Sequence, residues 1–575
     1  METKPITGDY MDPLLAFWTN VFDNTPCLLT ESLNPDLIFA FKAKAKGIKD
    51  PDLFNWDEAM NSPYREEFLK AAAEEIQSLE EQNTWTEVPR REAQDRIIPC
   101  QWVFRLKRTP DGEIKKVKGR LVLRGDLQQY TGETFSPVAS WTTVRVFLVV
   151  SETQGRVTCT IDFSNAFVQS PLPADEPVWM HLPRGFRSIL GAETCVFLNK
   201  SLYGHAVAPL LWYKHICKYF EKLGLKKSKY DPCLWYGRRL MIVQYVDDMG
   251  ISAERQEDID LFVSDLRKEG LVLTQEESFS EFLGIKFETR QDGSKEMTQK
   301  GLIKKILTAA GMEDCNPNAL PHGSQPLVKD QKGPPMKEPW NIRAIVGMLV
   351  YLSTNTRPDI AFAVSQVCRF TSNAKQSHAT GVKTILRYLK GTQEKGTIVK
   401  PTPNIKLDLY VDADFAGTHG VEENSDPDSA KSRMGYILFL CGWPLVWKSQ
   451  LLSCISTSTT HAEYHALSSA LKVLLPCKWV TQEIVNNMPS LKLENTTIHA
   501  TAFEDNAAAY HLATNQRLTN RTKYFWIKLH WFWEHYNNKE FEISKCPSDA
   551  NIADFYTKCL SRDKFTTHRK SAIGW

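Results

Sequence analysis

Hydrophobic residues in the first half of the chain recur at two different spacings. Apolar runs at residues 156–161, 240–246 and 249–252 are short and bounded by polar residues, which predicts buried strands. A helix is predicted to start at Ser62-Pro63, because apolar residues then recur at helical spacing: Leu69, Ala72, Ile76 and Leu79. Residues 1–52 have no sustained period and are interpreted as a leader or linker.

The second half of the chain changes pattern twice. Residues 297–400 are predicted to be mostly helical, with a proline-rich loop at 315–339. From residue 407, apolar and polar residues alternate as in a half-buried strand. Further strands are expected at 434–440, 444–448 and 497–503, and helices at 460–483, 506–514 and 551–560. The fold class indicated is a multidomain α+β and α/β protein, with a mixed sheet in its last domain.

Composition narrows the class of protein without naming it. No apolar run is long enough to span a bilayer, so we expect no membrane association. The 13 cysteines are scattered and form no zinc-binding pattern, which is typical of an intracellular, reducing compartment. The net charge of +2 is uninformative, but residues 105–126 are strongly basic and contain a turn at Pro110-Asp111-Gly112. Beside the motifs below, we interpret this region as a phosphate-contacting strand pair, with a solvated hairpin as the alternative.

Three carboxylates follow two of the predicted strands. Asp247 and Asp248 lie between the second and third apolar runs, and Asp162 ends the first. If the strand 156–162 lies beside the strand 240–247, the three side chains meet at one edge of a sheet and can bind two Mg²⁺ ions about 3.5–4 Å apart. An ordinary acidic turn is the competing interpretation of Asp247 and Asp248.

A series of longer motifs runs along the chain. They are Trp102-Val103-Phe104-Arg105, Lys118-Gly119-Arg120-Leu121-Val122, Glu133-Thr134-Phe135-Ser136-Pro137-Val138, Ile161-Asp162 with Asn165-Ala166-Phe167, Lys200-Ser201-Leu202-Tyr203-Gly204, Tyr245-Val246-Asp247-Asp248, Phe282-Leu283-Gly284-Ile285, Arg357-Pro358-Asp359-Ile360-Ala361 and Leu386-Arg387-Tyr388-Leu389-Lys390-Gly391-Thr392. In order and spacing they resemble the reverse transcriptases of copia-type LTR retrotransposons, from about residue 53 to the C-terminus.

The resemblance implies a right-hand polymerase followed by a ribonuclease H (RNase H)-like domain. Fingers and palm would occupy residues 53–290, the thumb and connecting helices 291–400, and the RNase H-like domain 401–575. It also implies the substrates, namely an RNA template, a DNA primer, deoxynucleoside triphosphates (dNTPs) and an RNA–DNA hybrid. Other polyprotein products are possible partners, and the expected location is a cytoplasmic virus-like particle.

The resemblance also assigns roles to individual residues. Asp162, Asp247 and Asp248 are similar to the metal-binding polymerase triad. Phe167 takes the position of a steric gate, where a bulky ring would exclude a 2′-hydroxyl; a core phenylalanine is the alternative. The nucleotide-binding residues implied are Lys118, Arg120, Phe167 and Tyr245. Leu283 and Gly284 would belong to the primer-holding hairpin, although the segment also fits a plain apolar strand.

A second set of carboxylates lies in the last domain. Their surroundings resemble the four RNase H blocks of the same family, which implies an Asp-Glu-Asp-Asp cage for two Mg²⁺ ions, with Mn²⁺ possible. The four residues are Asp412, Glu463, Asp505 and Asp554. Asp414 could share or replace the role of Asp412.

Two segments depart from the family pattern. His205-Ala206-Val207-Ala208-Pro209-Leu210 stands where the family usually has Leu-Lys-Gln-Ala-Pro-Arg, so Val207 replaces a glutamine expected to touch the incoming nucleotide. Residues 521–526 replace an Arg-Ser/Thr-Lys-His-Ile-Asp block. The alternative to an active polymerase is therefore a catalytically impaired, nucleic-acid-binding remnant of a retrotransposon polyprotein.

Overall fold

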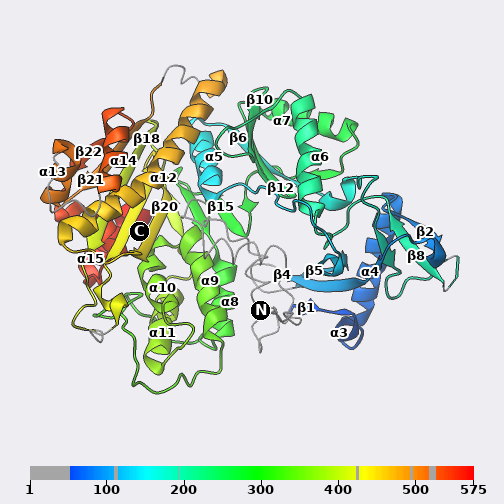
Figure 1. The fold of residues 1–575 in the computed structure, drawn as a ribbon, viewed down its shortest axis with the longest axis horizontal. Coiled ribbons are helices and arrows are strands. Elements are labelled where there is room, and N and C mark those ends of the chain that lie inside the picture. Colours follow the sequence, from blue (N-terminus) through cyan, green and yellow to red (C-terminus); the bar gives the residue numbers. More distant parts are fainter. Residues whose placement is uncertain are drawn as a thin grey trace, which may run out of the picture.

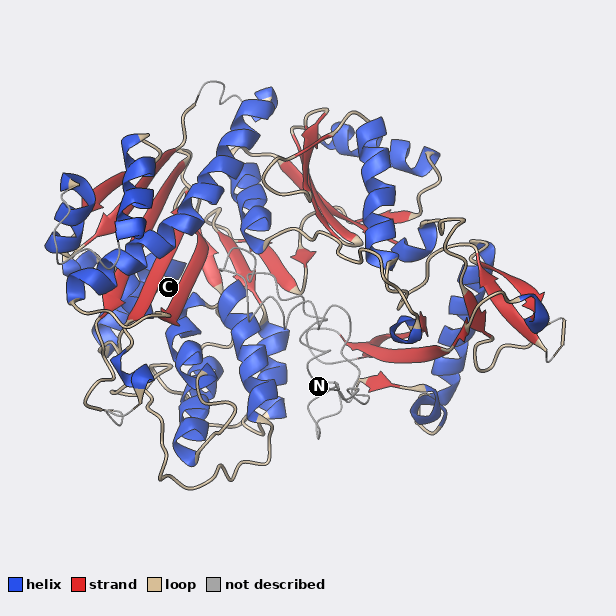
Figure 2. Ribbon diagram, in the orientation of Figure 1, coloured by secondary structure: helices blue, strands red, loops and turns tan. Residues whose placement is uncertain are grey.

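The computed structural model describes residues 52–108, 114–188, 190–191, 193–421, 426–491, 496–516 and 526–575. The leader assigned to residues 1–52, except its last residue, lies outside this part of the chain, as do the turn at Pro110-Asp111-Gly112 and residues 521–525. Figure 1 follows the chain from two small N-terminal sheets through a central sheet and a group of helices to a C-terminal sheet. Figure 2 shows both helices and strands across the molecule, as expected for an α+β and α/β protein.

The N-terminal part contains sheets of order β1-β4-β5 and β2-β8-β7-β3, with helices α3 (Trp56–Met60) and α4 (Arg65–Glu81). Their strands are β1 (Leu53–Phe54), β2 (Trp85–Pro89), β3 (Ile97–Ile98), β4 (Cys100–Arg108), β5 (Ile114–Leu123), β7 (Trp179–His181) and β8 (Thr194–Leu198). The predicted helix start at Ser62-Pro63 is wrong, because the Ser62 hydroxyl donates to the Ala59 carbonyl (2.8 Å) in the turn after α3.

The central sheet has six strands in the order β13-β6-β12-β11-β10-β9. They are β6 (Val157–Phe163), β9 (Lys226–Lys227), β10 (Leu234–Gly237), β11 (Leu240–Tyr245), β12 (Asp248–Ala253) and β13 (Leu273–Gln275). The helices packed around it are α5 (Trp141–Thr153), α6 (Ala208–Lys222) and α7 (Gln256–Lys268). Every residue of β11 is buried, which explains why its sequence is a continuous apolar run rather than an alternating one.

A four-stranded sheet and a group of helices follow. The sheet has the order β14-β15-β16-β17, with β14 (Glu281–Phe282), β15 (Ile285–Thr289), β16 (Lys295–Thr298) and β17 (Thr397–Val399). The helices are α8 (Lys300–Ala309), α9 (Ile342–Asn355), α10 (Ala361–Cys368) and α11 (Gln376–Gly391). They share one apolar core, so the predicted loop at 315–339 connects helices that pack together.

The C-terminal sheet has the order β20-β19-β18-β21-β22, with β21 parallel to both of its neighbours. Its strands are β18 (Lys406–Asp414), β19 (Arg433–Leu440), β20 (Trp443–Leu451), β21 (His499–Glu504) and β22 (Glu542–Lys545). Leu407, Leu409 and Val411 share a core with the long helix α12 (Thr459–Asn487), whereas Ile437 and Phe439 join the core of the α8–α11 helices. The sheet is thus covered on both faces.

The end of the chain differs from one expectation. Helices α13 (Ala507–Asn515), α14 (Trp526–Asn537) and α15 (Arg562–Ile573) are present, but the helix predicted at 551–560 is a short 3₁₀ turn, η9 (Ile552–Tyr556). The buried Asn551 side chain donates to the Val411 carbonyl (2.8 Å) and accepts the Ala553 N–H (3.1 Å). This anchor holds the segment against β18.

Buried polar contacts join the central and C-terminal sheets. Arg145 of α5 donates to the carbonyls of Leu445, Thr354 (2.5 Å) and Asn355 (3.3 Å). Glu483 of α12 accepts hydrogen bonds from the 228–236 segment beside β10. In the described part of the chain, no helix has the length and apolar character needed to cross a bilayer.

Candidate active sites

Strand order places the first carboxylate set at one end of the central sheet, although the neighbour of β6 is β12 and not β11, the strand expected beside it. Strand β12 is antiparallel to β6, and Asp248 pairs with Asp162 in the register of their Cα atoms. Residues directly opposite each other in an antiparallel pair project to the same face of the sheet. Asp247 lies in the tight turn between β11 and β12, so all three carboxylates belong to one end of the central sheet.

The turn that carries Asp247 is held from two sides. Val246 has a positive φ of 55°, an uncommon conformation for a β-branched residue. The Trp212 indole N–H donates to the Val246 carbonyl (2.7 Å), and the Phe163 N–H donates to the Asp247 carbonyl (3.1 Å). The surrounding fold therefore fixes this strained turn. Tyr245, just before it, is buried with 4% of its surface exposed.

A basic residue of β5 lies near one of these carboxylates. Lys118 and Arg120 are two residues apart on the strand and half-buried. Burial, together with the nearby charges of Arg120 and Lys107, lowers the pKa of Lys118 to about 8, while Glu75 and Asp162 act in the opposite direction. Lys118 is therefore within electrostatic range of Asp162.

Two aromatic rings complete this region. Phe167 lies in the 3₁₀ turn η3 (Ala166–Gln169) directly after β6 and is half-buried. Its ring meets that of Tyr203 edge-on, with 5.0 Å between the centroids. The Arg120 guanidinium lies over the other ring, 4.5 Å from the centroid of Tyr203.

Sequence reasoning missed Tyr203 and Glu75. Tyr203 was recognised only as part of a motif, without a role. Glu75 lies on the buried face of α4 between Ala72 and Leu79, and its Oε1 accepts the Leu121 N–H of β5 (3.4 Å). A glutamate among apolar residues at helical spacing was the available signal for it.

Leu283 and Gly284 form the tight turn between β14 and β15. Both have positive φ, 51° and 74°, which glycine adopts freely and leucine rarely. The Tyr351 hydroxyl of α9 donates to the Leu283 carbonyl (2.8 Å). The segment is therefore a hairpin turn tied to the helices, rather than only a plain apolar strand.

Of the residues in 205–210 that depart from the family pattern, three are buried: His205, Val207 and Leu210. Val207 and Leu210, at the start of α6, are 1% and 8% exposed and pack into the apolar core. His205 is 3% exposed, and neither of its ring nitrogens has a hydrogen-bond partner. Burial lowers its pKa to about 4.

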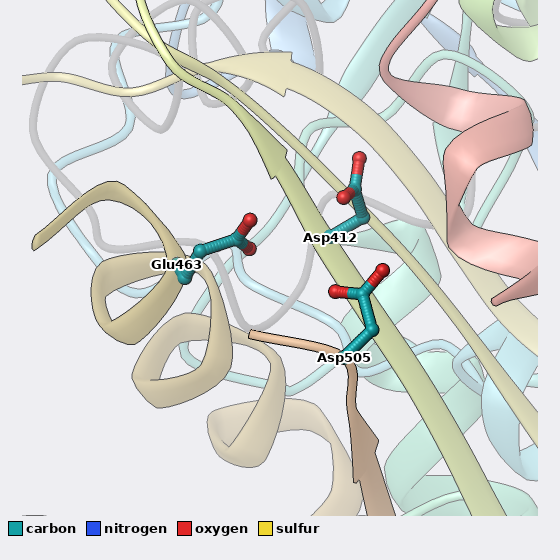
Figure 3. Close-up of side chains that lie close together, drawn as sticks. All are labelled: Asp412, Glu463 and Asp505. Carbon is teal, nitrogen blue, oxygen red and sulfur yellow. The ribbon is translucent and has the colours of Figure 1, made fainter. Parts of the chain in front are cut away.

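Three carboxylates of the second set converge closely. Asp412 lies on β18, Glu463 near the start of α12 and Asp505 directly after β21, and Figure 3 shows their side chains pointing toward one another. One oxygen of each lies within 4.8 Å of the others. Among the described residues, this is the one group of three acidic, histidine or cysteine side chains that meets so closely.

The electrostatics of this group favour a bound cation. Asp412 and Glu463 are 1% and 7% exposed, and burial beside other carboxylates raises their pKa values to about 6 and about 10. Glu463 Oε2 is buried without a hydrogen-bond partner. Crowded carboxylate oxygens of this kind are the donors that Mg²⁺ and Mn²⁺ prefer, so the residues fit such an ion.

Asp554 joins this cluster through a lysine. The Lys558 ammonium lies 2.7 Å from Asp554 Oδ1 and 3.2 Å from Asp412 Oδ1. The Thr557 hydroxyl donates to Asp412. Asp414 is half-buried on the same strand but outside the close group of three.

Glu504, a further carboxylate, was not singled out in the sequence. It is fully buried beside Asp505, and burial raises its pKa to about 8. Its Oε1 accepts the Asn506 N–H (3.0 Å), and its Oε2 is buried without a partner. Its place at the end of a strand, next to a predicted ligand, was the signal available.

Comparison with known proteins identifies the family. Residues 82–324 match the family model described as reverse transcriptase (RNA-dependent DNA polymerase). The chain is 30% identical over 529 residues to the retrovirus-related Pol polyprotein from transposon TNT 1-94 of Nicotiana tabacum, covering 88% of this chain and 38% of that protein. It is 29% identical over 507 residues to the Pol polyprotein from transposon RE1 of Arabidopsis thaliana, covering 87% and 33%.

The chain thus spans about a third of the length of these relatives. A solved foamy viral protease–reverse transcriptase in complex with double-stranded DNA has a TM-score of 0.44 and 13% identity, covering 83% of this chain and 69% of that one. The sequence similarity, rather than this structural one, carries the assignment. The chain belongs to the reverse transcriptases of copia-type retrotransposon polyproteins.

Proposed function

We propose that the chain is an RNA-directed DNA polymerase joined to an RNase H, working as a right hand with fingers, palm and thumb. Residues 53–290 would form the fingers and palm, 291–400 the thumb and connecting helices, and 401–575 the RNase H domain. The observation that carries the proposal is the convergence of two separate carboxylate sets. Asp162 pairs with Asp248 at the end of the central sheet, and Asp412, Glu463 and Asp505 meet in the C-terminal domain.

In the polymerase site, the chain's own residues would bind and orient the reactants. Asp162, Asp247 and Asp248 would hold divalent cations, and Lys118 and Arg120 would bind the triphosphate of an incoming dNTP. Phe167 and Tyr245 would line the sugar and base positions, with Phe167 excluding a 2′-hydroxyl. When bound, Mg²⁺, or Mn²⁺ in its place, supplies charge neutralisation at the phosphates and lowers the pKa of the attacking hydroxyl or water.

The primer would lie against the turn formed by Leu283 and Gly284. Positive φ values at both positions make this turn sharp, and Tyr351 ties it to α9. A backbone turn supported by a helix offers a fixed edge against which the primer end can be aligned.

In the RNase H site, Asp412, Glu463, Asp505 and Asp554 would hold the cations that direct water onto a phosphodiester. The unpartnered buried oxygen of Glu463 supports a cation there, because a buried carboxylate without a partner is costly. Selection of the RNA strand would come from contacts to 2′-hydroxyls.

The test uses one variant for each site. On a poly(rA)/oligo(dT) template with Mg²⁺, Asp247→Asn should abolish primer extension and leave cleavage of RNA in a hybrid, whereas Glu463→Gln should do the reverse. Asp549→Asn, at a side chain that is 91% exposed, is the matched control and should retain both activities. Loss of both activities in either site variant would contradict the two-site proposal.

A non-catalytic remnant is the second candidate, favoured by the changes at 205–210. Hybrid binding without primer extension by the wild-type chain would support it over the polymerase. For an active enzyme, we propose the cytoplasm, inside a virus-like particle and beside other products of the polyprotein, as its place of action.

A further inference from the structure

Tyr203 lies where the basic strand β5 meets the turn that carries Phe167. Its side chain is nearly buried, with 9% exposed. One face of the ring receives the Arg120 guanidinium at 4.5 Å, and the ring of Phe167 packs against it at 5.0 Å and 65°. A single side chain therefore contacts both the residue proposed to bind the triphosphate and the residue proposed to exclude the 2′-hydroxyl.

The backbone of Tyr203 is fixed to β5 itself. The Leu123 N–H, at the end of that strand, donates to the Tyr203 carbonyl (2.7 Å). Gly204 has a φ of 84°, and a Cβ there would lie 2.1 Å from the Leu123 carbonyl oxygen. The chain therefore packs backbone to backbone at this point, which fixes the Cα of Tyr203 against the strand that carries Arg120.

The contacts of the ring have a defined chemistry. A guanidinium over an aromatic face is attracted by the negative face of the ring, and an edge-on pair places the positive edge of one ring against the face of another. Burial raises the pKa of the Tyr203 hydroxyl well above its usual range. The phenol is therefore neutral at physiological pH.

We propose that Tyr203 is a positioning residue that holds the Arg120 guanidinium and the Phe167 ring in one arrangement, so that triphosphate binding and sugar selection depend on the same side chain. This rests on the proposed polymerase function. If the ring is removed, Phe167 loses the contact that sets its orientation, and a 2′-hydroxyl is excluded less well. The arginine loses its support at the same time.

The test compares Tyr203→Phe, which keeps the ring, with Tyr203→Leu and Tyr203→Met, which remove it. Incorporation of dTTP and of UTP is measured on poly(rA)/oligo(dT), with kcat and KM for each. Tyr203→Phe should match the wild type. The ring-free variants should have a higher KM for dTTP and should use UTP more readily relative to dTTP. Each change should be about two- to tenfold, which corresponds to the loss of one aromatic contact. Their kcat for dTTP should stay within about twofold of the wild type.

A double-mutant cycle with Phe167→Val tests whether the two rings act together. Tyr203→Leu combined with Phe167→Val should be no more tolerant of UTP than Phe167→Val alone. The proposal would be overturned if the double variant showed the product of the two single effects on UTP use relative to dTTP. It would also be overturned if either folded ring-free variant used UTP and dTTP in the same ratio as the wild type. Thermal melting identifies folded variants, and failure of all ring-free variants to fold would also contradict it, because Tyr203 would then be a core residue. A wild-type chain that extends no primer contradicts the polymerase function itself.

Discussion

Replacing His205 by leucine should stabilise the protein. His205 is 3% exposed, and both of its ring nitrogens are buried without partners. A buried polar group left unsatisfied costs ~1–3 kcal/mol, whereas leucine, the family's usual residue here, has no polar atom to desolvate. We expect a gain of about 2 kcal/mol at pH 7.5, which corresponds to ~4–8 °C in the melting transition of a domain of this size.

The stabilisation should grow as the pH falls. Burial lowers the pKa of His205 from 6.5 to about 4. Between these two pH values, His205 is therefore protonated in the unfolded chain but stays neutral in the folded chain. The folded wild type is therefore penalised below pH 6.5, increasingly until pH 4. At pH 5 this lowers the free energy of unfolding of the wild type by ~2 kcal/mol. His205→Leu has no titrating group at this position, so the difference in stability between the two proteins should reach ~4 kcal/mol.

Thermal unfolding followed by tryptophan fluorescence at pH 7.5 and pH 5 measures both effects. His419→Leu, at an exposed histidine, is the matched control and should change stability little at either pH. A melting temperature for His205→Leu at or below that of the wild type would refute the reasoning about the unpartnered nitrogens. A difference that does not widen at pH 5 would refute the reasoning about its pKa.

Three further substitutions test other contacts. Glu483→Ala removes the acceptor for the Ser228 hydroxyl, the Lys229 N–H and the Tyr236 hydroxyl. It should lower the free energy of unfolding, measured by chemical denaturation, by ~3 kcal/mol. An unchanged midpoint would show that these hydrogen bonds do not join the central and C-terminal sheets. Lys558→Met removes an ammonium between Asp412 and Asp554. Isothermal titration calorimetry should then show that Mn²⁺ binds about tenfold more tightly, a gain of ~1.4 kcal/mol. Weaker binding would mean that the lysine supports the cation site. Tyr351→Phe loses the hydrogen bond to the Leu283 carbonyl, which contributes ~1 kcal/mol to holding the turn. In primer extension with excess competing template, its products should become shorter while KM for dTTP is unchanged. Full-length products would argue against a primer-aligning turn.

The sequence predicted those parts of the fold that depend on local patterns. Apolar runs located β6, β11 and β12, and Asp162 lies opposite Asp248, although β6 pairs with β12 rather than with β11 as expected. Alternation from Leu407 located β18. The helix expected at 551–560 failed because Asn551 anchors that segment to Val411 across the sheet, and such a contact leaves no local periodicity.

The parts that could not be predicted depend on packing between distant segments. Tyr203 acquires its neighbours because Gly204 packs against the end of β5. The position of Lys558 between Asp412 and Asp554 follows from how η9 lies against β18. The loss of a nucleotide contact at Val207 stays a prediction, and the sequence did not reveal that Val207 and Leu210 are buried.

Anomalous diffraction from crystals soaked in Mn²⁺ tests the central claim most directly. We expect manganese peaks at two separate places, one within coordination distance of Asp162 and Asp248 and one among Asp412, Glu463 and Asp505. Asp248→Asn should remove only the first and Glu463→Gln only the second. Peaks at neither set, or at one set alone in the wild-type protein, would contradict an enzyme with two metal-dependent sites.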